Sequence, residues 1–292
     1  MCTPLHIEND RISLTTDNPA GQMFSLFDKK TNQELLYQAD QGWSGRNPSL
    51  FPMVGSTWKD GSYTWQGQTY AMKNHGLIRY EDLCGTVSED GQTIRYTFDS
   101  NEETKSRYPF DFHFLLMYTL IPEGVRVSYA ITNTGNDPMP FSFGLHPAFN
   151  TVRSENEAFE DFSIHFDPVE EAEQIVFYKD LRPVNREPKT LDTWNLSYDD
   201  LKQYATLVFD QIKATSATLY YKDQPRMKVG FDGFPSVALW NPGEGNTFIC
   251  IEPWFGHADF EKVEVPFDKR EGTMILLPGE TFNASYTIES LE

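Results

Sequence analysis

The sequence has little cysteine and no cysteine pattern of a known site type. Its three cysteines, Cys2, Cys84 and Cys250, are an odd number, and no two of them have metal-ligand spacing. Cys250 lies in the apolar run 247–251, where a small hydrophobic residue would be buried. Without a disulfide pattern or an obvious metal site, we expect a protein of a reducing compartment, with the cytoplasm as the default.

Positive charge is also scarce. The chain carries 24 Lys and Arg against 43 Asp and Glu, a formal net charge of -19. Nucleic acids and anionic membrane surfaces both require a basic footprint, so we expect neither as a partner. A strongly anionic substrate is disfavoured unless a local basic pocket exists.

Long hydrophobic runs are missing as well. The first residues have neither a basic start nor an apolar core, so we expect no signal peptide. No apolar run approaches the length of a transmembrane helix. These absences predict a cytoplasmic protein that does not enter a membrane.

The 292 residues, 39% of them hydrophobic and 14% aromatic, are enough to bury a large core. Short alternating runs separated by turn signals predict roughly twenty strands. No stretch keeps a helical period over three turns, and only single helical turns are expected, at 101–108 and 199–204. Segment 151–205 is acidic and proline-containing, and we expect a long loop with short strands there. The fold prediction is therefore an all-β sandwich of large sheets, with one domain over residues 1–292.

Segment 141–150 predicts a strand with two different faces. Its apolar face consists of Phe141, Phe143 and Leu145, and its other face of Ser142, Gly144 and His146. We expect the small residues to leave room above the sheet for a ligand. Pro147 should end the ladder and hold His146 in an extended conformation. Taken alone, His146 is better explained as a solvated or hydrogen-bonded residue at a strand end.

Segment 247–256 repeats this arrangement, with Glu252 followed by Pro253 at the end of an apolar strand. Burying a carboxylate there is costly, and partial burial would raise its pKa toward the range of a general base. Trp254 follows closely and Trp240 ends the preceding strand, which offers aromatic faces to a sugar. His146 and Glu252 are thus a candidate acid–base pair, although spacing alone does not bring them together.

Two further segments carry candidate binding residues. Arg46 lies in segment 43–55, which is rich in Gly, Pro and Ser but also carries large apolar residues, as a packed site loop would. A surface salt bridge is the alternative role for Arg46. His75 precedes Gly76, where glycine permits a positive φ or a close backbone approach.

Together these segments resemble the aldose 1-epimerase (galactose mutarotase) family, and within it the LacX-like branch. The resemblance extends over nearly the whole chain, and five motifs in this order carry it: Arg46 with 47–52, 74–79, 144–150, 233–240 and 251–256. It implies a galactose mutarotase-like β-supersandwich of large antiparallel sheets, with a sugar on the concave face of one sheet.

The resemblance also implies roles for single residues. His146 would be the general acid and Glu252 the general base, while Arg46 and His75 would contact the sugar. Trp240 and Trp254 are the predicted aromatic binding residues, and no metal or other cofactor is implied. The sequence departs from the family in one place: the aspartate that binds a sugar hydroxyl is missing from 203–209, and the first acid is Asp210.

The predicted function is interconversion of the α and β anomers of an aldohexose, such as galactose or glucose, by a monomer or homodimer. A non-catalytic carbohydrate-binding protein of the same fold is one alternative. A hexose 6-phosphate mutarotase is another, but it would need a cluster of Arg or Lys, and Arg46 and Arg79 are the only arginines in the motifs. A glycoside hydrolase or lyase is the third, although hydrolases usually use two carboxylates.

Overall fold

The computed structural model describes residues 3–177 and 182–292, so Cys2 lies outside the described residues. These residues form 23 strands and two short helices, α1 (Glu102–Arg107) and α2 (Tyr198–Tyr204). Single 3₁₀ turns occur at η1 (Ile78–Tyr80), η2 (Phe159–Asp161) and η3 (Phe267–Lys269). The all-β prediction and both predicted helical turns are confirmed.

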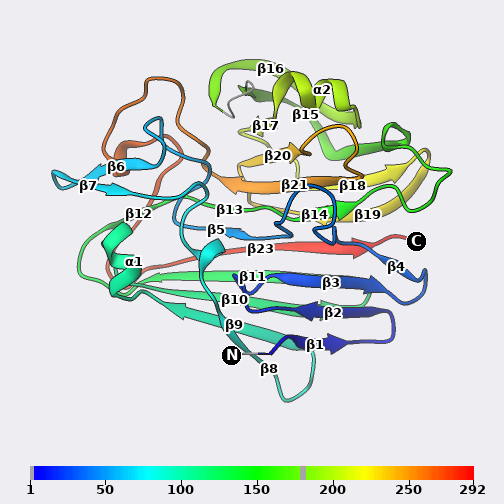
Figure 1. The fold of residues 1–292 in the computed structure, drawn as a ribbon, viewed down its shortest axis with the longest axis horizontal. Helices are drawn as coiled ribbons and strands as arrows, with labels where there is room; N and C mark the ends of the chain where they lie inside the picture. The colour runs from blue at the N-terminus through cyan, green and yellow to red at the C-terminus, as the bar shows by residue number, and fades with distance from the viewer. Residues whose placement is uncertain (1–2, 178–181) are drawn as a thin grey trace.

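One antiparallel sheet of fifteen strands dominates the molecule (Figure 1). Thirteen strands follow one another across it in this order: β5 (Ser49–Leu50), β13 (Phe143–Leu145), β21 (Phe248–Phe255), β20 (Ser236–Trp240), β17 (Leu207–Asp210), β15 (Phe162–Phe177), β18 (Ser216–Tyr221), β19 (Gln224–Gly230), β23 (Thr281–Ser290), β11 (Gly124–Asn133), β10 (Phe112–Ile121), β9 (Thr93–Asp99) and β8 (Cys84–Val87). The other two, β14 (Ala148–Asn150) and β16 (Pro183–Asn195), pair with β21 and β15.

Three smaller sheets complete the fold. The first has four strands, β1 (Leu5–Glu8), β2 (Ile12–Thr16), β3 (Met23–Asp28) and β4 (Gln33–Glu34). It lies beside β9 and β10, where the Tyr118 hydroxyl donates to the Gly21 carbonyl at 2.7 Å. The other two are the pairs β12 (Met139–Phe141) with β22 (Met274–Leu276) and β6 (Ser62–Trp65) with β7 (Gln68–Ala71).

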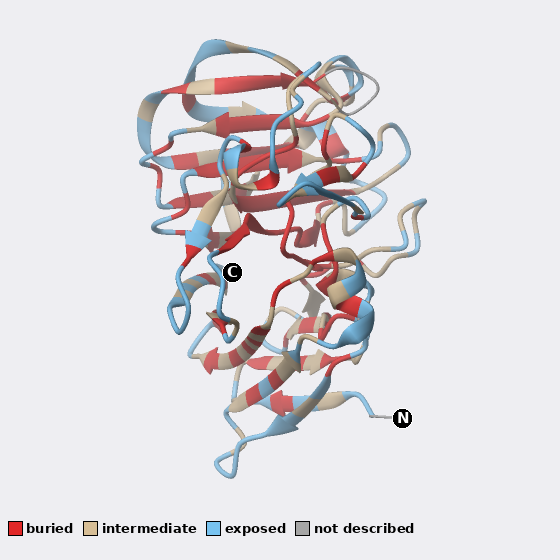
Figure 2. Cartoon of the chain, turned by 90° about the vertical axis from the view of Figure 1, so that its left-hand side faces the viewer, coloured by how far each residue is buried: buried red, intermediate tan, exposed pale blue. Residues whose placement is uncertain are grey.

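Burial differs between strands near the two ends of the large sheet (Figure 2). Strand β10 alternates between buried and half-buried residues, as a strand with one face on the core does. In β13 and β21 almost every residue is buried, because loops cover the face that does not contact the main core. A polar side chain on β13 or β21 is therefore removed from bulk water.

The prediction of a long loop over 151–205 is wrong. Strands β15 and β16, with 16 and 13 residues, form a long hairpin there, and α2 follows it. Acidic residues and prolines obscured the alternation, because much of β16 is exposed and a bulge interrupts the pairing between His165 and Glu170. Strand β15 is buried at both ends, but its mostly exposed middle (167–171) breaks the apolar alternation. Strand β16 is exposed along most of its length, so neither strand carries the usual sequence signal.

The segment around His146 is an interruption in the ladder beside β21. Strand β13 ends at Leu145 and β14 begins at Ala148, and both pair with β21. Strand β21 continues through Pro253 to Phe255, whereas the sequence predicted that it would end at Glu252. Ile251 donates its N–H to Pro147, so residue 253, two positions on, faces the same side. Proline is tolerated there because its missing N–H faces the interruption.

In the part of the chain described, no helix is long and apolar enough to cross a membrane. A single domain over residues 1–292 stays a prediction.

Candidate active site

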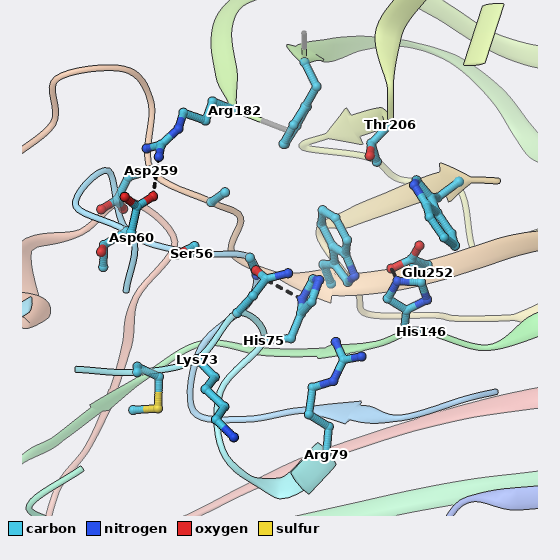
Figure 3. A pocket seen from close by; sticks show the side chains of 18 of the residues that line it. Ser56, Asp60, Lys73, His75, Arg79, His146, Arg182, Thr206, Glu252 and Asp259 are labelled. Carbon is cyan, nitrogen blue, oxygen red and sulfur yellow. Dashed lines mark hydrogen bonds and ion pairs between the residues drawn. The ribbon is translucent and has the colours of Figure 1, made fainter. Parts of the chain in front are cut away.

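A cavity of about 550 Å³ opens beside strands β20 and β21 (Figure 3). His146 and Glu252 lie at one end of it, with Trp43, Trp240 and Trp254 among the residues that line it. Its other end is lined by loop residues, including Asp60, Arg182 and Asp259. The cavity is thus built from segments that are far apart in the sequence.

The structure brings His146 and Glu252 into contact. The His146 Nε2 atom lies 3.4 Å from Glu252 Oε2, and the two residues are 7% and 1% exposed. His146 is positioned by the gap between β13 and β14, and Glu252 by β21, which runs past that gap. The Nδ1 atom of His146 and the Oε2 atom of Glu252 are buried and have no hydrogen-bond partner among the described residues. The imidazole and the carboxyl group therefore lie side by side at one end of the cavity, each with one buried polar atom left without a hydrogen bond.

Burial controls the protonation of this pair. It raises the pKa of Glu252 well above its ordinary value, although the positive charge of Arg79 acts against it. Burial also lowers the pKa of His146 well below its ordinary value, and His75 and Arg79 lower it further. In the empty site the pair therefore favours a neutral carboxyl beside a neutral imidazole, which together hold one transferable proton.

His75 lies beside this pair, with its ring 5.6 Å from that of His146 in an edge-to-face arrangement. Its Nδ1 atom accepts a hydrogen bond from the Gly55 N–H at 3.1 Å. Burial, assisted by Arg79, lowers the pKa of His75 to about 3, so the ring is neutral with its proton on Nε2. The backbone prediction is confirmed, since Gly76 has a φ of +85° and a Cβ there would lie 2.3 Å from the Phe51 carbonyl oxygen.

Arg79 is the site residue to which the sequence gave no role. It belongs to the motif 74–79, and η1 directs its side chain into the cavity, toward the His146–Glu252 pair (Figure 3). Within residues 3–177 and 182–292 its guanidinium forms no ion pair and contacts the Tyr80 ring at 5.3 Å. His75, in the same motif, was predicted as a sugar-binding residue. Arg79 lines the same cavity only because the local turn η1 directs its side chain there.

Trp43 is the second missed residue. Its indole stacks on the His146 ring at 4.7 Å and meets Trp240 edge-on at 5.4 Å. Trp240, which was predicted, lies 5.5 Å from the His146 ring. The only signal for Trp43 was a large aromatic residue at the start of a Gly/Pro/Ser-rich loop.

Arg46 lies elsewhere. Its guanidinium stacks over the Phe24 ring at 4.0 Å, and among the described residues Arg46 is not part of the cavity lining. Asp210 is also outside the cavity, because it pairs with Arg186 at 3.2 Å and accepts from Ser236 at 2.6 Å. Thr206 lines the cavity just before the start of β17.

The small residues of segment 141–146 do not leave room for a ligand, contrary to the prediction. A Cβ on Gly144 would lie 2.6 Å from the Trp254 ring and 3.0 Å from Val54. The Ser142 hydroxyl accepts a hydrogen bond from the Val54 N–H at 2.9 Å. Protein fills this space: the Trp254 indole, 4% exposed, is held by its N–H bond to the Leu145 carbonyl oxygen.

Gly144→Ala is therefore expected to lower the free energy of unfolding by about 1–3 kcal/mol, since it overpacks a filled space. Gly135→Ala is the matched control, because a Cβ there meets nothing closer than 3.4 Å. Urea unfolding of both variants measures the difference. Equal unfolding midpoints for the two variants would contradict this account of Gly144.

Comparison with known proteins assigns the class. The family model described as aldose 1-epimerase matches residues 6–289, and the chain belongs to this family. The protein LacX (chromosomal) of Lactococcus lactis subsp. lactis is 30% identical, over 98% of this chain and 99% of its own.

Solved structures agree with this assignment. A galactose mutarotase related enzyme from Lactobacillus acidophilus superimposes with a TM-score of 0.92 at 27% identity, over 99% of this chain and 98% of its own. A galactose mutarotase-like protein from Lactobacillus casei has a TM-score of 0.86 at 24% identity, over 98% and 99% of the two chains, and shows the same fold. The predicted galactose mutarotase-like sandwich is confirmed.

Proposed function

We propose that this protein is an aldose 1-epimerase that interconverts the α and β anomers of an aldohexose such as galactose or glucose. The observation that carries the proposal is the buried contact of 3.4 Å between His146 and Glu252 at one end of the cavity. Ring opening needs one proton removed from O1 and one delivered to O5, and two adjacent groups that share a proton can supply both.

Glu252 takes the proton from the C1 hydroxyl while His146, as imidazolium, gives its proton to the ring oxygen. The C1–O5 bond breaks, and the open-chain aldehyde forms. Glu252 is now a neutral carboxyl and His146 a neutral imidazole. Rotation about C1–C2 presents the other face of the carbonyl, and the two groups exchange roles as the ring closes. Protons balance over the cycle, and each group returns to its starting state.

The neutral pair favoured in the empty site holds the same number of protons as the charged pair that opens the ring. The two forms differ only by transfer of one proton between adjacent atoms. The positive charge of Arg79 lowers the pKa of Glu252, which favours the carboxylate, and it also lowers the pKa of His146, which disfavours imidazolium. We assign Arg79 to support of the general base.

Substrate binding falls to the residues around the pair. Trp43, Trp240 and Trp254 offer aromatic surface to the C–H face of a pyranose. His75 carries its proton on Nε2 and is a neutral donor for a sugar oxygen. Arg79, rather than Arg46, is the guanidinium that the cavity offers to a hydroxyl.

A hexose 6-phosphate is the second candidate substrate, because Lys73, Arg79 and Arg182 all line the cavity. Asp60 and Asp259 line it too, and Asp60 pairs with Arg182, which reduces the positive charge available for a dianion. Free aldohexoses therefore remain the first choice.

Polarimetry of freshly dissolved α-galactose, α-glucose and α-glucose 6-phosphate tests the proposal. We expect the protein to accelerate equilibration of a free sugar above the spontaneous rate. Acceleration confined to the phosphorylated sugar would favour the second candidate. Binding without acceleration of any sugar would identify a carbohydrate-binding protein and refute the proposal.

The pH profile of kcat/KM reports the state of the pair. The lower step, entry of a second proton, should lie below the ordinary His value of 6.5, because burial disfavours imidazolium. The upper step, loss of the shared proton, should lie well above the ordinary Glu value of 4.5. A lower step at or above pH 6.5, or an upper step at or below pH 4.5, would contradict this prediction.

A further inference from the structure

We infer that His146, Cys250 and Glu252 form a binding site for a thiophilic divalent cation, Zn²⁺ or Cd²⁺, which would inhibit the enzyme reversibly. One ligand atom of each residue lies within 4.8 Å of the other two, and all three residues are buried. Spacing along the chain gave no sign of this group, because the imidazole comes from a segment about a hundred residues before the other two.

The alternation of β21 explains how Cys250 reaches the pair. Residues two apart on a strand point to the same face, so the side chains of Cys250 and Glu252 are neighbours. Cys250 packs with Phe248, Tyr37 and Ala148, and Trp43 and Trp240 pack against this cluster. The proposed reaction uses no thiol, so the sulfur is an extra potential ligand beside the acid–base pair.

The geometry suits a tetrahedral ion. Nitrogen and oxygen ligands about 2.1 Å from zinc in a tetrahedron lie about 3.4 Å apart. This is the separation between His146 Nε2 and Glu252 Oε2. The sulfur needs to approach by at most about 1 Å to reach its bonding distance. The fourth position would face the cavity and accept water.

The chemistry of the donors also points to a metal. Glu252 Oε2, one of the three proposed ligand atoms, is buried and has no hydrogen-bond partner among the described residues. A thiolate, an imidazole and a carboxylate together select zinc or cadmium over magnesium or calcium, which prefer oxygen ligands alone.

Bound metal would block the proposed reaction, because it occupies the atoms that must accept and donate protons. Sugar and metal would therefore compete for one site. The inhibition rests on the proposed function, whereas metal binding itself does not.

The experiment titrates the intact protein with CdCl₂ and ZnCl₂. Cadmium binding is followed by the ultraviolet thiolate-to-cadmium charge-transfer band and by calorimetry, and inhibition by polarimetry at several sugar concentrations. We expect the charge-transfer band, inhibition that is competitive with sugar, and recovery on addition of EDTA.

Cys250→Ala and Cys250→Ser are the test variants, because neither replaces one of the two proposed proton carriers. Both should retain mutarotation, lose the band and bind the metal at least about tenfold more weakly. His113→Gln is the control for surface binding, since it removes the exposed His113–Asp99 pair and should bind like the native protein.

Two results would overturn the inference. One is a native protein without a cadmium band, and the other is equal metal affinity in the native protein and both Cys250 variants. If the native protein binds cadmium through Cys250 but accelerates no sugar, the proposed function fails and the metal site stands.

Discussion

Glu252→Gln and His146→Asn should each lower kcat/KM for mutarotation by about 10²–10⁴-fold, as expected for loss of one positioned acid–base group. Glutamine has the size of glutamate, and asparagine is a smaller polar replacement for histidine, but neither can carry the transferred proton. Because the two groups act on the same proton transfers, the double variant should lose much less than the product of the two single losses. Polarimetry of the three variants measures this.

The free energy of unfolding distinguishes a loss of catalysis in these variants from misfolding. Glu252 has a raised pKa in the folded protein, so at neutral pH folding must protonate a carboxyl that is ionised in the unfolded chain. At neutral pH, each unit of rise in the pKa of Glu252 lowers the free energy of unfolding by about 1.4 kcal/mol. Glutamine does not titrate and avoids this loss. Glu252→Gln should therefore be more stable than the native protein at pH 7, and the difference should vanish below pH 4.5. For activity, a near-normal kcat/KM in either single variant would refute the assignment of His146 and Glu252 as the acid–base pair.

Asp259→Ala should lower the free energy of unfolding by about 3–5 kcal/mol, because it leaves a buried charge without its partner. Asp259 Oδ1 lies 2.7 Å from Arg270 Nε, and the two side chains are 8% and 2% exposed. The second oxygen of Asp259 accepts the Trp58 N–H at 3.2 Å. Arg270 already has one buried nitrogen without a partner among the described residues, so it has little else to pair with.

Glu264→Ala is the matched control for this prediction. It removes the Lys59–Glu264 pair, whose side chains are 58% and 53% exposed, and surface pairs contribute about 0–1 kcal/mol. Urea unfolding at one pH compares the two variants with the native protein. If both lose the same small amount, the buried pair does not stabilise this region as described.

Local sequence signals were enough for much of this fold. Alternation and turn residues identified strands such as β10 and β11, where one face is buried and a two-residue period is therefore preserved. They failed for β15 and β16, because a mostly exposed segment with a bulge interrupts β15 and most of β16 is exposed, so neither strand keeps a continuous apolar period. The same signals gave a wrong prediction for Gly144. A glycine indicates that a larger side chain would not fit, but it does not show whether protein or a ligand occupies the space.

For the candidate site, the sequence by itself determined which groups can do the chemistry. A histidine and a glutamate before prolines, at the ends of apolar segments, identified His146 and Glu252 as one potential pair. Composition alone disfavoured nucleic acids and anionic membranes as partners, because the net charge of -19 leaves no broad basic surface.

Only the tertiary structure decided which of these groups meet. Strand pairing places the gap between β13 and β14 beside Glu252, and this sets the 3.4 Å contact with His146. It also directs Arg79, Trp43 and Cys250 to the pair and Arg46 to Phe24. Distance in space depends on sheet register, which joins residues about a hundred positions apart, and no local pattern encodes that separation.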